Sequence, residues 1–130
     1  MSESWASNIG AITLFVDDVA AAKSFYLEAF ALPVHFEDEV SCVFKVGPTL
    51  VNLLAASEAG ELIEPAVVAE GGGSRFMLTI DVPDVDAVVA RLAARGIGLL
   101  NGPVNRPWGP RTAAFRDPAG HVWEIAGPAR

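Results

Sequence analysis

An internal duplication is the feature that most restricts how this chain can fold. Residues 11–16 alternate between two faces as a half-buried strand does, and an amphipathic helical pattern follows Asp18. The same strand-and-helix pattern returns 66 positions later, with Asp84 in the place of Asp18. The matching apolar pairs are Ile12 with Leu78, Leu14 with Ile80, and Val16 with Val82. Two copies of one supersecondary unit are therefore predicted.

Each copy continues with three further stretches of strand character. Pro33 and Gly96 mark where the two predicted helices end. The additional strands are expected at 34–37, 42–46 and 50–54 in the first copy, and at 99–104, 111–116 and 122–125 in the second. Each copy is thus a βαβββ module.

The predicted fold class is α+β, with two tandem βαβββ modules forming one pseudo-twofold domain over residues 1–130. Module one is expected at about 8–56, a linker rich in Ala, Glu and Gly at about 57–74, and module two at about 75–128. A helix covers only one face of each sheet, so the two bare faces are expected to enclose a cleft.

Composition excludes several classes of protein. The chain has 130 residues, of which 52% are hydrophobic, so one folded domain with a core is expected. Its net charge of -7 argues against nucleic-acid binding, which needs a basic surface. No apolar run exceeds four residues, and residues 1–10 lack the pattern of a signal peptide. Together with a single cysteine, Cys42, this favours a cytoplasmic protein without membrane contact.

Several motifs together resemble the vicinal oxygen chelate superfamily, which includes glyoxalase I, extradiol dioxygenases and bleomycin-resistance proteins. They are the duplicated βαβββ pattern, VDDVAAAKSFY at 16–26, VPDVDAVVARLAARGI at 82–97 and the closing DPAGHVWEI at 117–125. The resemblance covers nearly the whole chain and implies the glyoxalase/bleomycin resistance fold. It does not specify an activity, because function depends on the site that a fold carries.

The resemblance also implies where relatives that use a metal would hold it. The four positions that face the cleft are here Ala11, Asn52, Met77 and Glu124. Only Glu124 is a credible ligand, and an open catalytic site normally needs at least three protein ligands. No metal and no cofactor are therefore expected, which disfavours glyoxalase and ring-cleaving dioxygenase chemistry.

The predicted cleft is apolar with a few polar groups, which is typical of a small-molecule site. The alternative is that the same side chains fill a closed core. The predicted ligand-binding residues are Thr13, Phe15, Asn52, Met77, Thr79, Trp108, Arg111 and Glu124.

Three of these residues allow two interpretations each. Glu124 is the single candidate for a catalytic base, and its partner is expected to be Arg111, a ligand amine or a neighbour in a dimer; alternatively, a neighbouring strand holds it by a hydrogen bond. Trp108 either stacks on a flat ligand or packs under its loop. Arg111 either binds a ligand carboxylate or pairs with a surface acid.

The closing motif contributes three further expectations. His121 is expected in a turn or at the surface, with its side chain on the opposite face from Glu124. Trp123 and Ile125 are expected to pack on the helix of the second module.

The function that these observations favour is a metal-free binding protein for a hydrophobic or aromatic metabolite or antibiotic, acting by sequestration. The resemblance implies a homodimer. Two alternatives are a metal-dependent lyase, isomerase or dioxygenase of the same superfamily, and a structural module without a ligand. A role in antibiotic resistance and a role in biosynthesis both remain open.

Overall fold

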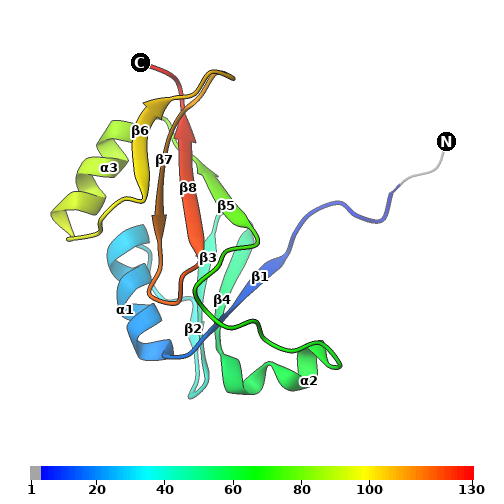
Figure 1. Ribbon diagram of the computed structural model, residues 1–130. Coiled ribbons are helices and arrows are strands. Elements are labelled where there is room, and N and C mark those ends of the chain that lie inside the picture. The colour runs from blue at the N-terminus through cyan, green and yellow to red at the C-terminus, as the bar shows by residue number, and fades with distance from the viewer. Residues whose placement is uncertain (1–3) are drawn as a thin grey trace. The chain divides into compact units, whose positions relative to one another are not determined.

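The computed structural model describes residues 4–130, and contacts within the chain divide it into two compact units, whose elements Figure 1 labels. The first unit contains the described residues up to Val19 together with Leu32–Val68, and the second contains Ala20–Ala31 and Ala69–Arg130. No helix among residues 4–130 is long and apolar enough to span a membrane.

The first unit is built on a four-stranded sheet with the strand order β1-β4-β3-β2. Strand β1 runs parallel to β4, and the other neighbours are antiparallel. The strands are β1 (Ala11–Val16), β2 (Phe36–Glu37), β3 (Ser41–Val46) and β4 (Thr49–Ala55). A 3-10 helix η1 (Ala56–Glu58) and a short helix α2 (Gly60–Ile63) follow β4, in the region predicted as a linker.

The second unit repeats this topology with the strand order β5-β8-β7-β6. Strand β5 runs parallel to β8, while β7 pairs antiparallel with both β6 and β8. The strands are β5 (Met77–Asp81), β6 (Asn101–Asn105), β7 (Arg111–Arg116) and β8 (Val122–Gly127), and the helices are α1 (Val19–Phe30) and α3 (Val85–Ala94). The predicted α+β class, with two modules whose strands follow the same order, is confirmed.

Helix α1 groups with the second sheet, although the duplication assigns it to the first module. The ring of Phe25 lies 6.2 Å from that of Phe115 on β7, and the ring of Phe30 lies 5.0 Å from that of Trp123 on β8. The prediction that Trp123 packs on the second helix therefore misses its aromatic partners, which belong to α1. Aromatic side chains on both sides make this contact large and apolar.

Strand alternation gives each sheet a face of largely buried apolar side chains and an opposite face, called the open face below, on which exposed residues such as Thr13 and Met77 accompany buried ones such as Leu54 and Ala114. In the first unit Leu14, Phe44 and Leu53 are buried on one face. In the second unit Phe115 and Trp123, which are paired across β7 and β8, are buried on the face that carries the helices. Residues of the opposite parity face the other side of each sheet.

Local signals in the sequence explain both ends of α3. The Asp84 carboxylate accepts a hydrogen bond from the Ala87 amide at 3.1 Å, which caps the first turn of the helix. Gly96 has φ +75 and ends the helix, while the amide of Ile97 donates to the Leu92 carbonyl at 3.0 Å. A residue without a side chain adopts this left-handed conformation at no steric cost.

A buried chain of hydrogen bonds joins α1 to the turn between β7 and β8. The Trp123 indole donates to the Tyr26 hydroxyl at 2.8 Å, and this hydroxyl donates to Asp117 Oδ2 at 2.6 Å. His121 Nδ1 lies 2.8 Å from the same oxygen, and Asp117 Oδ1 accepts from the amides of Ala119 and His121. Both carboxylate oxygens of a buried acid are thereby satisfied, which offsets its desolvation.

The hydrogen bonds also keep this acid ionised. Burial by itself raises the pKa of Asp117, but the hydrogen bonds from His121 and Tyr26 outweigh burial and hold the pKa below its ordinary value. Burial, followed by the negative charge of Asp117, raises the pKa of Tyr26 far above its usual range. The hydroxyl therefore stays protonated and available as a donor.

We expect Asp117→Asn to destabilise the protein in a pH-dependent way. Because the pKa of Asp117 is lower in the folded chain, the unfolded chain binds the proton more readily, and wild-type stability falls as the pH drops below about 4. The variant lacks this contribution. Its free energy of unfolding should therefore be lower than that of wild type by about 1.5–3 kcal/mol at neutral pH, and the difference should shrink in acid.

Urea unfolding at neutral pH and at about pH 3 measures this difference. Asp81→Asn, at an exposed acid of the same unit, is the matched control and should leave the unfolding midpoint unchanged at both values. A deficit of equal size at neutral and acid pH would contradict the charged role of Asp117.

We expect Gly127→Ala to be destabilising because β8 passes close to the chain that leaves β5. A Cβ at Gly127 would lie 2.5 Å from the Val82 carbonyl oxygen, so the backbone would have to shift at a cost of about 1–3 kcal/mol. Gly10→Ala, where a Cβ meets nothing within 4 Å, is the control. Equal unfolding midpoints for the two variants in guanidinium would refute the close approach.

Candidate functional site

The open face of the first sheet carries a polar group without a partner. Asn52 on β4 lies beside Thr13 on β1 and Val43 on β3. Its Oδ1 atom is buried and has no hydrogen-bond partner among residues 4–130. Thr13 is exposed and Phe15 is half-buried on the same face, as their parity predicts. A buried acceptor left without a donor is costly, so a molecule that donates a hydrogen bond would be stabilised here.

The open face of the second sheet places an acid beside a hydroxyl. Glu124 on β8 lies opposite Thr79 on β5, whose hydroxyl donates to Glu124 Oε1 at 3.0 Å. The observed partner of Glu124 is thus a neighbouring strand, the alternative that the sequence left open. Met77 is 48% exposed and Thr79 is also exposed, so neither belongs to a closed core within its unit.

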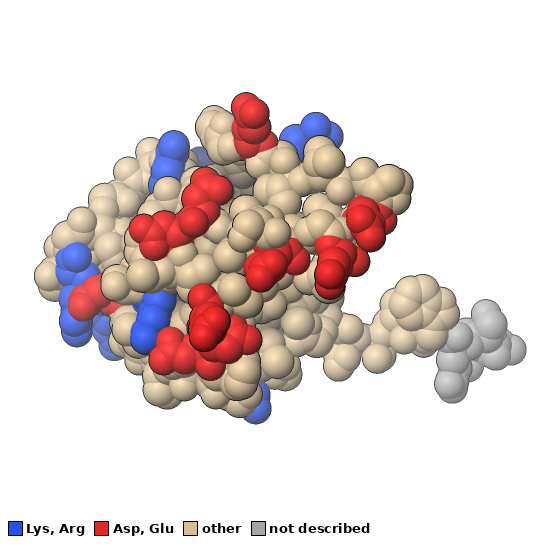
Figure 2. Space-filling view, turned by 90° about the horizontal axis from the view of Figure 1, so that it is seen from below, with Lys and Arg blue, Asp and Glu red and all other residues tan. Residues whose placement is uncertain are grey.

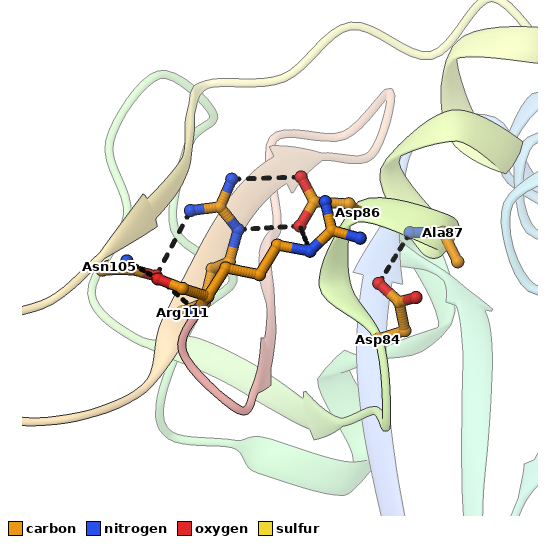
Figure 3. Close-up of polar contacts among 6 residues, drawn as sticks. Asp84, Asp86, Ala87, Asn105 and Arg111 are labelled. Atoms are coloured by element: carbon orange, nitrogen blue, oxygen red, sulfur yellow. Dashed lines mark hydrogen bonds and ion pairs between the residues drawn. The ribbon is translucent and has the colours of Figure 1, made fainter.

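Arg111 lies on the other face of the second sheet and does not reach Glu124. It pairs with Gly127, whereas Glu124 pairs with Ala114, and these two pairs have opposite parity. Its guanidinium binds Asp86 of α3 with two hydrogen bonds, of 2.8 and 3.0 Å (Figure 3). The expected partnership with Glu124 is therefore corrected, and the interpretation that Arg111 pairs with an acid holds.

The carboxylate of Asp86 is a centre for several contacts. Figure 3 shows the guanidinium of Arg111 directed at both of its oxygens, and Arg130 Nε lies 3.4 Å from Oδ2. The hydrogen bonds from Arg111 lower the pKa of Asp86, burial opposes them, and the positive charges of Arg111 and Arg130 lower it further. Asn105 accepts from Arg111 at 3.3 Å and donates to the Arg130 carbonyl at 2.7 Å. The cluster is a structural clamp of β6 and β7 on α3.

Trp108 lies at the tip of the β6–β7 hairpin and is 72% exposed. It does not pack under its loop. The guanidinium carbon of Arg106 lies 5.8 Å from the indole centroid, and Arg106 is itself held by Thr112 and Asn101 at 2.8 and 2.9 Å. One side of the indole therefore carries a cation–π contact, and the ring is otherwise accessible for stacking.

The residues at the predicted metal positions do not fit a metal ion. Ala11 and Met77 are on open faces but offer no hard donor, which leaves the amide of Asn52 and the carboxylate of Glu124. Within residues 4–130 no group of three or more His, Cys, Asp or Glu side chains is arranged to hold a metal.

The roles of Asp117 and His121 do not follow from the fold-specific motif in which they lie. Both residues belong to the closing DPAGHVWEI motif, which by itself indicates only the fold. An acid followed by Pro and Gly predicts a turn, and Asp117 does organise that turn through the amides of Ala119 and His121. Its bond to Tyr26 joins residues 91 positions apart, so no local signal predicts it.

A protein-family model decides what these two sheets belong to. The model described as Glyoxalase/Bleomycin resistance protein/Dioxygenase superfamily matches residues 8–125. The chain belongs to this superfamily. The resemblance inferred from the duplicated βαβββ pattern and the closing motif is thereby confirmed.

Similar members of the superfamily include both enzymes and binding proteins. The uncharacterized protein YraH of Bacillus subtilis (strain 168) is 34% identical over 119 residues, which cover 88% of this chain and 93% of YraH. A glyoxalase-related enzyme from Fulvimarina pelagi is 27% identical with a TM-score of 0.79, covering 92% of this chain and 87% of that one.

A second similar structure is that of TnmS3, described as an antibiotic binding protein from Streptomyces sp. CB03234. It is 27% identical with a TM-score of 0.73, covering 98% of this chain and 100% of its own. Family membership alone therefore leaves both catalysis and binding available to this chain.

We expect Arg111→Gln to weaken the attachment of β7 to α3, because the hydrogen bonds to Asp86 are lost. The residues on the open face should be unaffected. The variant should unfold at a lower urea concentration, and the pKa of Asp86 should rise toward its ordinary value because its main hydrogen-bond donor is gone. The destabilisation should shrink at high salt, which screens charge pairs at the surface. Carboxyl-carbon NMR titration measures the pKa, and an unchanged value would contradict this pairing.

Proposed function

We propose that this protein binds a small hydrophobic or aromatic molecule, such as a metabolite or an antibiotic, and acts by sequestration without a metal. The residues proposed to contact a ligand are Thr13, Phe15 and Asn52 on the open face of the first unit, and Met77, Thr79 and Glu124 on the open face of the second. Trp108 contributes a stacking surface. Arg111 is not part of this site, because its side chain lies on the helix-covered face.

The unpartnered oxygen of Asn52 is the observation that carries the proposal. A buried carbonyl oxygen without a donor costs about 1–3 kcal/mol, and a ligand that donates an N–H or O–H group recovers this energy on binding. The surroundings on the same face are largely apolar, which suits a ligand with an apolar body.

Two further observations support this class of function. The donor set at the family's metal positions is too poor for metal chemistry, which disfavours the lyase, isomerase and dioxygenase alternatives. A similar structure, that of TnmS3, is described as an antibiotic binding protein. Within this proposal the protein is a cytoplasmic homodimer, as the family resemblance and the cysteine content suggest.

The charge of the protein restricts the class of ligand further. The net charge is -7, and acidic side chains are spread over the face that Figure 2 shows. Such a surface attracts cations and repels nucleic acid. A cationic or neutral aromatic compound is therefore favoured over a polyanion.

Thermal unfolding in the presence of bleomycin, tetracycline and daunorubicin tests the proposal. A ligand at about 100 times its dissociation constant stabilises the fold by roughly 2.7 kcal/mol. Mass spectrometry should then recover the bound compound unchanged. Conversion of the compound would overturn sequestration, and so would stoichiometric Ni, Zn, Fe, Mn or Co in the purified protein. No shift with any of the three compounds would refute an antibiotic ligand.

We expect Asn52→Leu to separate stability from binding. Removing an unsatisfied buried acceptor should keep or raise the midpoint of thermal unfolding. Affinity for the compound that raises the midpoint of the wild-type protein should fall at least about tenfold, because one hydrogen bond to that compound is lost. Glu61→Gln, at an exposed acid of α2, is the control and should leave affinity unchanged. Full affinity in Asn52→Leu would remove Asn52 from the site.

A further inference from the structure

The open face of the second sheet carries a negative and a positive charge that are not paired with each other. Strand pairing places four residues in one row across the sheet, from β5 to β6: Thr79, Glu124, Ala114 and Asn101. Glu124 on β8 is therefore two strands away from Asn101 on β6. Neighbouring strands lie about 4.8 Å apart, so the Cα atoms of these two residues are roughly 10 Å apart.

The positive charge belongs to Arg106, whose side chain lies over this same face. Its Nε donates to Thr112 Oγ1 at 2.8 Å, and its Nη2 donates to Asn101 Oδ1 at 2.9 Å. Both acceptors belong to the face of Glu124, because Asn101 lies in its row and Thr112 precedes Ala114 by two residues on β7. Two separate hydrogen bonds therefore hold the guanidinium on the open face.

Neither charge is neutralised within the part of the chain that the structure describes. The Thr79 hydroxyl donates to Glu124 Oε1, whereas Oε2 accepts no hydrogen bond from residues 4–130. The acceptors that hold Arg106 are a neutral hydroxyl and a neutral amide. Both charged side chains are half-buried, and neither forms an ion pair with any other described residue. Because a charge that is partly removed from water is costly without an opposite charge, each group favours a ligand group of the opposite sign.

The surface between the two charges is small and apolar. Ala114 follows Glu124 in the row, and Ala126 occupies the next position of β8 on the same face. The side chain of alanine ends at its Cβ, so the longer charged side chains flank a low floor. Trp108 adds a ring beside Arg106, whose guanidinium carbon lies 5.8 Å from the indole centroid. An apolar floor next to an exposed indole suits a flat aromatic body.

We propose that this open face binds an aromatic compound that carries a protonated amine at one end and a carboxylate at the other. The ammonium group binds Glu124, the carboxylate binds Arg106, and the ring lies over Ala114 beside Trp108. This inference rests on the proposed function, because it names the ligand class for the same face. An ammonium group supplies donors to Glu124 Oε2, and guanidinium and carboxylate groups match in a planar geometry. The two charges of such a ligand cancel, so the net charge of -7 does not repel it.

Three matched compounds test both charges on the wild-type protein, so this test does not depend on the folding of any variant. The compound 4-(aminomethyl)benzoate carries both groups, 4-methylbenzoate lacks the amine, and 4-methylbenzylamine lacks the carboxylate. NMR titration of the backbone amides gives the three dissociation constants. The complete compound should bind at least about tenfold more tightly than either of the others, because each of those loses one charged hydrogen-bonded contact. Equal affinity of the complete compound and either of the others would overturn the proposal.

Two variants assign each end of the ligand to its residue. Glu124→Gln should weaken binding of 4-(aminomethyl)benzoate at least about tenfold and leave that of 4-methylbenzoate unchanged, because 4-methylbenzoate has no amine. Arg106→Gln should weaken binding of the complete compound to a similar extent and leave that of 4-methylbenzylamine unchanged. Asp81→Asn and Arg116→Gln, which remove an exposed acid and an exposed arginine of the same face, are the controls and should leave affinity unchanged. Equal losses in the variants and the controls would indicate a general effect of charge and refute the site.

The proposed function and this ligand class fail separately. If bleomycin, tetracycline or daunorubicin raises the midpoint of thermal unfolding while none of the three benzene derivatives binds, the protein binds an aromatic molecule and the ligand class named here is wrong. If the three compounds show the expected order of affinities but 4-(aminomethyl)benzoate is recovered chemically changed, sequestration is overturned and the assignment of the two charges stands.

Discussion

The second unit depends on the burial of one ionised carboxylate. Asp117 is buried and accepts hydrogen bonds from two turn amides, from Tyr26 of α1 and from His121. A buried charge is tolerated only when its hydrogen bonds are complete, so the β7–β8 turn and α1 must both be in place. The same helix places Phe25 and Phe30 against the sheet, where their rings contact Phe115 and Trp123.

Parity along the strands decides which chemistry is available on each face. Glu124 and Thr79 share the open face of the second sheet, and Asn52 and Thr13 share that of the first. Arg111 has the opposite parity, and its guanidinium is already bound to Asp86 of α3. Because successive side chains alternate, a difference of one residue separates a ligand-binding group from a structural one.

Much of the fold and part of the site follow from sequence patterns. Alternation located β1 and β7 at their observed bounds, and the cap at Asp84 and the glycine at 96 located α3, because these are local effects. The open-face positions of Thr79 and Glu124 also follow from parity. Their hydrogen bond, the partner of Arg111 and the exposure of Trp108 did not follow, since each depends on neighbours that are brought together only by folding.

The sequence by itself determined the two-module βαβββ pattern, the superfamily and the poverty of metal ligands at Ala11, Asn52, Met77 and Glu124. Periodicity, caps and residue identity carry these conclusions, and all of them act over a few residues. Only the tertiary structure decided that α1 groups with the second sheet, that Asp117 bonds Tyr26 and that Asn52 is left without a donor. Long-range contacts depend on which apolar and polar surfaces complement each other after folding, and a linear pattern does not contain that information.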